Sequence, residues 1–171
     1  MVHLYDARKH DGGPFSELKV EQPNLESFLT QRGVSSGDAK ELSRSEWKSI
    51  TFNAAGSQML ATARGGLAIL LDGFTADIMQ AFLADAGGSG TSNIGGDDDE
   101  RGVEDSITAC FTRDDRFVLG GCSDGTVKCW SAASGSLVNT LTGHVGPVSA
   151  IACNPRRAQV ASSCTNTALW I

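Results

Sequence analysis

Short apolar runs recur along the chain, and small or polar turn residues separate them. One stretch holds four such runs in succession, at residues 107–111, 116–122, 126–130 and 136–141. Near-continuous apolar runs of this length between turn residues predict buried β-strands. Asp124-Gly125 lies between the second and third runs and favours a tight hairpin, because the turn needs positive φ. The pattern therefore predicts a four-stranded antiparallel sheet.

The same unit occurs in two further copies. The earlier copy has its runs at 50–52, 57–63, 67–71 and 78–83, and the later copy has them at 148–153, 158–163 and 168–171. Phe111 and its counterpart Cys153 are 42 positions apart (153 − 111), which lies within the period of about 40–45 residues that is typical of propeller blades. Two runs near the start, 2–6 and 15–20, have the character of the last two strands of another blade. We expect an all-β fold: a partial β-propeller of about three to four blades out of seven.

The repeats divide the chain into six parts. These are the end of a truncated blade (1–22), an inserted loop (23–44), a blade (45–84), an acidic Gly/Ser-rich loop (85–105), a second blade (106–142) and an incomplete last blade (143–171). Both loops have too few apolar residues to offset the entropy of ordering, so we expect them to be mobile. Helical periodicity is weak, and the one amphipathic stretch, 25–29, is too short to form a helix alone.

Composition narrows the function classes. The 171 residues carry a net charge of −6, which disfavours broad binding to nucleic-acid backbones. Five cysteines, an odd number and with no CxxC pair, argue against a disulfide framework or a zinc site and favour buried, reduced thiols. The most apolar run, 67–71, is too short to span a bilayer, and the first residues lack the apolar stretch of a signal peptide.

A set of polar and aromatic residues marks the last two blades. Gly143-His144 precedes the last blade, and Ser162 and Trp170 follow within it. These residues resemble the signature of the WD-repeat family. The resemblance implies that His144, Ser162 and Trp170 join the strands of one blade through hydrogen bonds. The Asp position of that blade reads Thr165-Asn166, so the set is incomplete.

The two earlier blades depart from the signature in different ways. The blade at 106–142 keeps Asp124 and Trp130 but lacks a Gly-His pair before Ile107. The blade at 45–84 has Leu71 where the family has Trp. All five signature residues (His144, Ser162, Trp170, Asp124 and Trp130) are therefore expected to be structural.

Residues 1–8, 13–15, 46–47, 154–155, 161–166 and 169–170 most resemble one branch of that family. Its members are subunits of COMPASS-type histone lysine methyltransferase complexes and of PNUTS–phosphatase complexes. The resemblance implies a nuclear, non-catalytic adaptor that binds methyltransferase or phosphatase scaffold subunits and couples them to transcribing RNA polymerase. It also implies that the chain has no catalytic residues of its own. We further expect no cofactor, metal site, membrane contact, direct nucleic-acid contact or homo-oligomer. The loops at roughly 24–43 and 85–104 depart from this branch as insertions.

Other interpretations remain open. The chain could be a WD-repeat adaptor of another assembly, in ubiquitin ligation or ribosome assembly, or a truncated, non-functional fragment. In a propeller enzyme, His144 would act as general base and Cys153 or Cys164 as nucleophile. Asp97-Asp98-Asp99-Glu100 could bind a hard cation, although a solvated acidic loop is favoured because the spacing of an EF-hand is missing. An incomplete propeller leaves an apolar face uncovered at each end, so we expect the isolated chain to be unstable or to aggregate.

Overall fold

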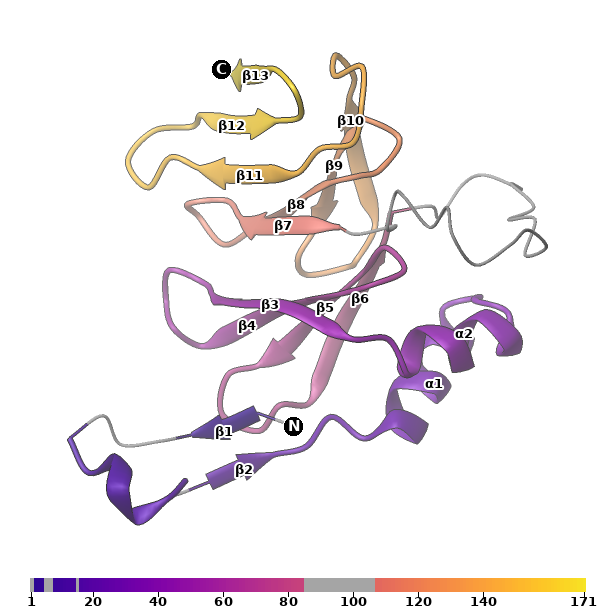
Figure 1. Ribbon diagram of the computed structural model, residues 1–171, viewed down its shortest axis with the longest axis vertical. Coiled ribbons are helices and arrows are strands. Elements are labelled where there is room, and N and C mark those ends of the chain that lie inside the picture. Colours follow the sequence, from indigo (N-terminus) through magenta and orange to yellow (C-terminus); the bar gives the residue numbers. More distant parts are fainter. Residues whose placement is uncertain (1, 5–7, 15, 85–106) are drawn as a thin grey trace.

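The computed structural model describes residues 2–4, 8–14, 16–84 and 107–171. Its strands form four antiparallel sheets (Figure 1). A two-stranded sheet holds β1 (Val2–Leu4) and β2 (Ser16–Leu18), with the short 3-10 helix η1 (His10–Gly12) between them. Blade 1 comprises β3 (Trp47–Phe52), β4 (Gln58–Ala63), β5 (Leu67–Asp72) and β6 (Ile78–Leu83). Blade 2 comprises β7 (Thr108–Phe111), β8 (Phe117–Gly121), β9 (Val127–Ser131) and β10 (Leu137–Leu141). The last blade comprises β11 (Ala150–Cys153), β12 (Val160–Ser163) and β13 (Thr167–Trp170).

Each blade is a simple meander in which every strand pairs with its neighbour in sequence. The sheets follow one another along the longest axis of the molecule, with the last blade at one end (Figure 1). The predicted architecture, mainly antiparallel sheets in a partial propeller, is confirmed. The acidic loop at 85–105, including the candidate cation ligands at 97–100, lies outside the described residues.

The segment 23–44 differs from its prediction. We expected an inserted loop, but the structure has two helices there, α1 (Gln22–Gln31) and α2 (Ser36–Ser43). Pro23 lies in the first turn of α1, where its missing N–H costs nothing. Gly33, at φ +89°, allows the chain to leave α1, and the hydroxyl of Ser35 caps α2 by accepting from the backbone N–H of Asp38 at 3.2 Å.

Packing against blade 1 explains why these short helices form. Leu25 and Leu29 of α1 and Ala39 of α2 are buried in one cluster with side chains of β4 and β5. These three buried side chains pack against the same sheet, and Leu42 of α2 is partly buried against it as well. Tertiary burial, rather than the strength of the helical pattern, therefore stabilises them. No helix in the described part of the chain is long and apolar enough to cross a membrane.

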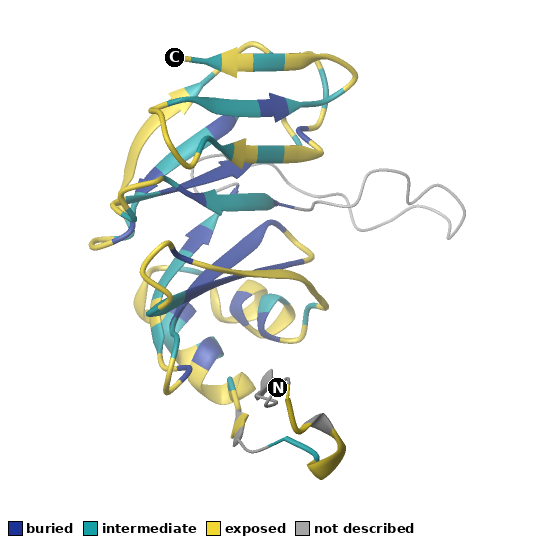
Figure 2. Cartoon of the chain, turned by 90° about the vertical axis from the view of Figure 1, so that its left-hand side faces the viewer, coloured by how far each residue is buried: buried dark blue, intermediate teal, exposed yellow. Residues whose placement is uncertain are grey.

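Two further apolar clusters join consecutive blades. The cluster between blades 1 and 2 contains Leu60, Ala68, Leu70, Phe82, Ala84, Ile107, Phe111, Val118, Cys122, Trp130 and Ala132. The cluster between blade 2 and the last blade is smaller, with Leu119, Val127 and Val148 buried at its centre. Buried residues accordingly gather where sheets face each other, and much of the last blade is intermediate or exposed (Figure 2).

Both ends of the stack leave apolar side chains open to solvent. On β3, Trp47, Ile50 and Phe52 are between 41% and 54% exposed, because the helices cover blade 1 only over its inner strands. On β13, Leu169 is 61% exposed. Blade interfaces are therefore well packed in the middle of the molecule and incomplete at its ends.

The turns between strands form two rims. Because neighbouring strands are antiparallel, the turns β3–β4, β7–β8 and β11–β12 lie at one end of the sheets, which we call the Arg113 rim (Figure 1). The turns β4–β5, β8–β9 and β12–β13 and the β10–β11 connection lie at the other end, which we call the Asp124 rim.

Candidate functional site

A hydrogen-bonded set links three elements of the last blade. The indole Nε1–H of Trp170 on β13 donates to Oγ of Ser162 on β12 at 2.8 Å. That oxygen lies 2.7 Å from Nε2 of His144, in the β10–β11 connection. Since the indole already donates to Oγ of Ser162, the hydroxyl hydrogen of Ser162 is available to a further acceptor. Three of the five predicted signature residues are thus brought together.

The side chains of His144 and Trp170 also pack against each other. The rings of His144 and Trp170 lie edge to face, with centroids 6.2 Å apart. A Cβ atom at Gly143 would lie 3.3 Å from the Trp170 ring, which is tighter than ordinary contact. The Gly-His pair therefore supplies both the polar ring and the space in which the indole packs against it.

Cys164, named above only as a candidate nucleophile, is a further partner of His144 that the family signature did not predict. Its Sγ lies 3.2 Å from Nδ1 of His144, at the position where the family signature predicts an Asp contact. Of the two residues expected at that position, Thr165 has its hydroxyl oxygen 3.7 Å from the same sulfur. The backbone N–H of Asn166 donates to the sulfur at 3.4 Å.

These donors make Cys164 an acidic thiol. Its pKa is lowered to about 6, first because of the backbone N–H of Asn166 and then because of the Thr165 hydroxyl and the adjacent His144. The chain of contacts Trp170–Ser162–His144–Cys164 therefore ends on a sulfur that carries a negative charge near neutral pH.

Asp124 and Trp130 of blade 2 do not join this set. Asp124 accepts from the backbone N–H and the hydroxyl of Thr126, at 2.8 and 2.6 Å. Although partial burial alone would raise its pKa, these bonds lower it. Asp124 closes the β8–β9 turn, where Gly125 at φ +82° is required because a Cβ would lie 2.8 Å from the carbonyl oxygen of His144.

Trp130 is a core residue. It is buried, and its ring centroid lies 5.6 Å from that of Phe82 on blade 1. Gly120 stands where Ser162 stands in the last blade, and a Cβ there would lie 2.6 Å from the Trp130 ring. Trp170 and Trp130 occupy the same strand position in their blades. In the last blade the Trp is held by a hydrogen bond, and in blade 2 it is held by packing.

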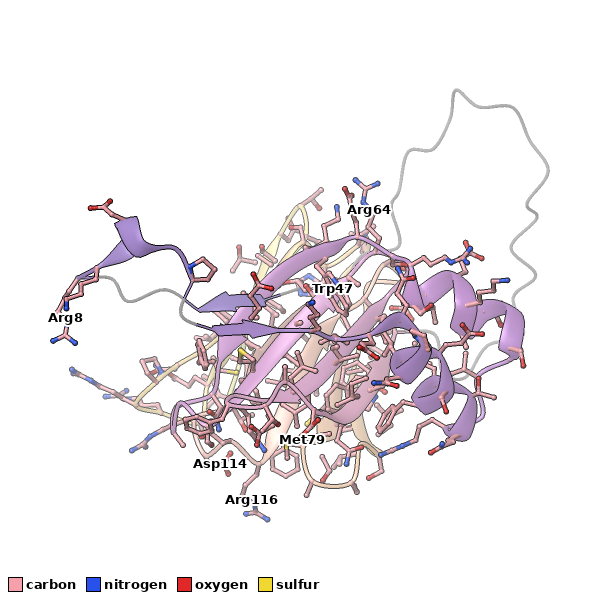
Figure 3. All side chains as sticks on the ribbon, turned by 90° about the horizontal axis from the view of Figure 1, so that it is seen from below. Arg8, Trp47, Arg64, Met79, Asp114 and Arg116 are labelled. Atoms are coloured by element: carbon pink, nitrogen blue, oxygen red, sulfur yellow. The ribbon has the colours of Figure 1, made fainter. Side chains whose placement is uncertain are left out.

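The Arg113 rim carries basic side chains over a cavity. The guanidinium of Arg113, in the β7–β8 turn, donates to the carbonyl oxygen of Arg156, in the β11–β12 turn, at 2.9 Å. A cavity of about 460 Å³ lies between these hairpins, and Arg113, Arg157, Phe117 and Cys153 are among its lining residues. Asp114 lies close to Arg116 at this rim (Figure 3), and its pKa is lowered first by the Thr112 hydroxyl.

Carboxylates at turns also tie the blades together. Asp115, in the β7–β8 turn, has a positive φ of 57°. Its two carboxylate oxygens accept from the backbone N–H groups of Ala54 and Ala55 in the β3–β4 turn, at 2.9 and 3.1 Å. Blade 2 is therefore bonded at this rim to blade 1 through Asp115 and to the last blade through Arg113.

The candidate nucleophiles lie in two separate places. Cys164 faces His144, whereas Cys153 faces Cys110 on the neighbouring blade at an Sγ–Sγ distance of 3.2 Å. Among the described residues no group of three or more His, Cys, Asp or Glu side chains could hold a metal ion. The cysteines present there are all free thiols.

Comparison with known proteins places these features in a family. Residues 101–131 and 135–170 match the family model "WD domain, G-beta repeat". The chain is 30% identical over 171 residues to "WD repeat-containing protein 82" of Drosophila melanogaster, an alignment that covers 99% of this chain and 44% of that protein. It is 25% identical over 130 residues to "COMPASS component SWD2" of Saccharomyces cerevisiae, which covers 76% of this chain and 31% of that protein. The chain thus spans less than half the length of these relatives.

A solved structure agrees in fold alone. The computationally designed Ika4 protein is similar with a TM-score of 0.52 and 20% sequence identity, over 73% of this chain and 65% of the designed one. The similarity concerns the arrangement of the strands.

Proposed function

We propose that this chain is a non-catalytic scaffold subunit of a nuclear, COMPASS-type histone methyltransferase complex. It belongs to the WD-repeat family, whose repeats mediate protein–protein interaction. The observation that carries the proposal is the alignment over nearly the whole chain with a WD-repeat protein, together with the similarity to a COMPASS component. The same adaptor would also serve a PNUTS–phosphatase complex in transcription termination, which is the other assembly implied by the sequence resemblance.

The chemistry of the His144 set supports a structural role. Both ring nitrogens of His144 have partners within the last blade, Ser162 and Cys164. Ser162 is buried and also holds Trp170. A serine nucleophile must be open to substrate, whereas Ser162, the hydroxyl that faces Nε2, is only 2% exposed. The set is therefore better suited to fastening strands than to catalysis.

The rims are the surfaces that a scaffold would offer. Turns on a rigid sheet framework are common recognition elements. The β5–β6 turn lies at the same end of the sheets as the Arg113 rim and belongs to it. Phe74 in this turn is 73% exposed. The Asp124 rim contains Val145, beside His144, which is 89% exposed. One large apolar side chain thus stands out on each rim.

The test is to purify a C-terminally tagged native copy from cells and identify co-purifying proteins by mass spectrometry. Recovery of a SET-domain methyltransferase or a PNUTS-like phosphatase scaffold is expected. Recovery of a ubiquitin-ligase or ribosome-assembly set in its place would contradict the proposal and favour a different adaptor. Chaperones alone would indicate that the chain does not reach a folded assembly.

Two matched variants locate the binding rim. Phe74→Asp and Val145→Asp each replace an exposed apolar side chain by a charge at a position outside the core, so both should leave folding unchanged. Loss of the partner from only one variant assigns binding to that rim. If neither variant loses it, neither of these two exposed side chains is a dominant contact in the complex.

A further inference from the structure

A pair of thiols spans the junction between blade 2 and the last blade. Cys110 lies on β7 and Cys153 on β11, and their Sγ atoms are 3.2 Å apart. The two strands are neighbours across the blade interface (Figure 1). Both cysteines pack against the apolar cluster of Leu119, Val127 and Val148. The separation of the two sulfurs therefore exceeds the S–S bond length of about 2.05 Å by only about 1.2 Å.

The two thiols differ in their readiness to react. The contact between the two thiols lowers the pKa of Cys153. The same interaction, followed by burial, raises the pKa of Cys110. A thiolate is the reactive form of cysteine. Cys153 also lines the cavity of the Arg113 rim, so we take it as the nucleophile of the pair and Cys110 as the resolving thiol beside it.

The cavity of the Arg113 rim gives access to the more reactive sulfur. Cys153 is one of its lining residues, whereas neither Cys110 nor Cys129 is. The volume of about 460 Å³ exceeds that of a small peroxide, since a water molecule occupies about 30 Å³. Cys153 is therefore the member of the pair that borders this cavity.

We propose that Cys110 and Cys153 form an oxidisable dithiol that staples blade 2 to the last blade when a small peroxide enters this cavity. The Cys153 thiolate attacks one oxygen of hydrogen peroxide, the O–O bond breaks, and Cys153 becomes a sulfenic acid while hydroxide leaves and takes up a proton. The Cys110 sulfur then attacks the sulfenic sulfur. The S–S bond forms, the S–O bond breaks, and water leaves with the Cys110 proton. Two thiols and one peroxide give one disulfide and two waters, and a thiol reductant reverses the bond.

The test uses the reduced, full-length chain carrying Cys164→Ser, because the acidic Cys164 thiol would otherwise compete for the oxidant. This chain is treated with hydrogen peroxide at near-stoichiometric concentration, and remaining thiols are then blocked with N-ethylmaleimide. Intact mass before blocking should fall by about 2 Da, the two hydrogens lost in forming one disulfide. After blocking, two of the four remaining cysteines should be labelled (5 − 1 − 2). Dithiothreitol before blocking should restore labelling of all four. Four labelled cysteines after peroxide, or a gain of oxygen atoms without a disulfide, would overturn the proposal. The variants that assign the pair are made in the same Cys164→Ser background.

Single variants assign the pair. Cys129 and Cys153 lie on one tryptic peptide because no Lys or Arg lies between Lys128 and Arg156, so Cys129→Ser is the matched control and should retain the disulfide. Cys153→Ser should abolish it and leave Cys110 unoxidised. Cys110→Ser should stop the reaction at a sulfenic acid on Cys153, which dimedone traps. Dimedone on Cys110 in the Cys153→Ser chain, or loss of the disulfide in the control, would contradict the assigned roles.

The folded structure must direct the pairing. In guanidinium chloride the same peroxide treatment should spread disulfides over other cysteine pairs, because chain proximity alone does not favour residues 43 positions apart (153 − 110). Equal yields of the Cys110–Cys153 bond in folded and denatured chains would show that the 3.2 Å contact plays no part.

Discussion

Blade 1 and the last blade stabilise the same strand position by different means. Leu71 in blade 1 lies opposite Met59, as Trp170 in the last blade lies opposite Val160. Leu71 is buried beneath the helices, whereas Trp170 is only half-buried and is held by its hydrogen bond to Ser162. Burial is non-directional, so a covered blade tolerates an aliphatic residue there. A blade with an open face obtains its order from directional bonds.

The largest effect on stability should come from removing a buried side chain of blade 1, the blade that the helices cover. Leu71→Ala removes a fully buried side chain between β5 and the helix cluster, so we expect a loss of about 2–5 kcal/mol in the free energy of unfolding. Urea titration at low protein concentration measures it. A loss below about 1 kcal/mol would mean that the helices do not hold this face and would remove the distinction between the two blades.

A smaller effect on stability should follow from removing the hydrogen bonds among His144, Ser162 and Trp170 in the last blade. Ser162→Ala leaves the Trp170 N–H and Nε2 of His144 without their shared partner, at a cost of about 1–3 kcal/mol. Ser163→Ala, one residue along the same strand, is the control and should change stability by less than about 0.5 kcal/mol. Equal effects of the two substitutions would show that the set is incidental to the last blade.

The same contrast explains what the sequence could predict. Strands followed from local signals, because apolar runs such as 67–71 and turn residues such as Gly125 define them without reference to the rest of the chain. The helices could not be predicted this way: Pro23, Gly33 and Ser35 are common in loops, and they became helix boundaries only because Leu25, Leu29 and Ala39 pack on a distant sheet.

For the candidate site, the family signature predicted the residues but not all of their contacts. His144, Ser162 and Trp170 were identifiable from their resemblance to the WD-repeat signature, and the structure brings them together. Cys164 was named only as a candidate nucleophile, and its place beside His144 depends on how the β12–β13 turn folds over the ring. The Cys110–Cys153 contact depends on the packing of two blades, which no spacing in the sequence specifies.

A modest effect should come from the tie between the helices and blade 2. The guanidinium of Arg32 donates to the carbonyl oxygen of Ser134 at 3.3 Å and to the side chain of Gln80. Because Arg32 is exposed, Arg32→Ala should cost no more than about 1 kcal/mol. Arg44→Ala, at the end of α2, is the control. A cost well above that of Leu71→Ala would mean that polar contacts, and not burial, hold the covered blade.

The smallest effect on stability, but a clear one on reactivity, concerns Cys164. With a pKa of about 6 in the folded chain, its iodoacetamide labelling rate should level off above pH 6 to 7 instead of rising towards pH 9. Because folding lowers this pKa, the thiolate's contribution to stability is present above the ordinary value of 9.0 and is lost as the pH falls through about 6.

His144→Gln should raise the midpoint of the Cys164 profile only in part, because the backbone N–H of Asn166 is the larger cause of the shift. Cys129, whose pKa is raised first by burial, is the internal control and should label slowly throughout. A Cys164 midpoint near 9 in the unmodified chain would show that the polar set of the last blade does not extend to the sulfur.

The strand order within each sheet also has a kinetic consequence. Every strand pairs only with strands adjacent to it in sequence, so each sheet closes through short turns with little loop entropy. Such local pairing favours rapid formation, and a repeat array can grow from any unit that forms first. During synthesis, blade 1 can complete its four strands before blade 2 leaves the ribosome. Blade 2 then meets a preformed surface, with Leu70 and Phe82 already in place for Trp130 to cover.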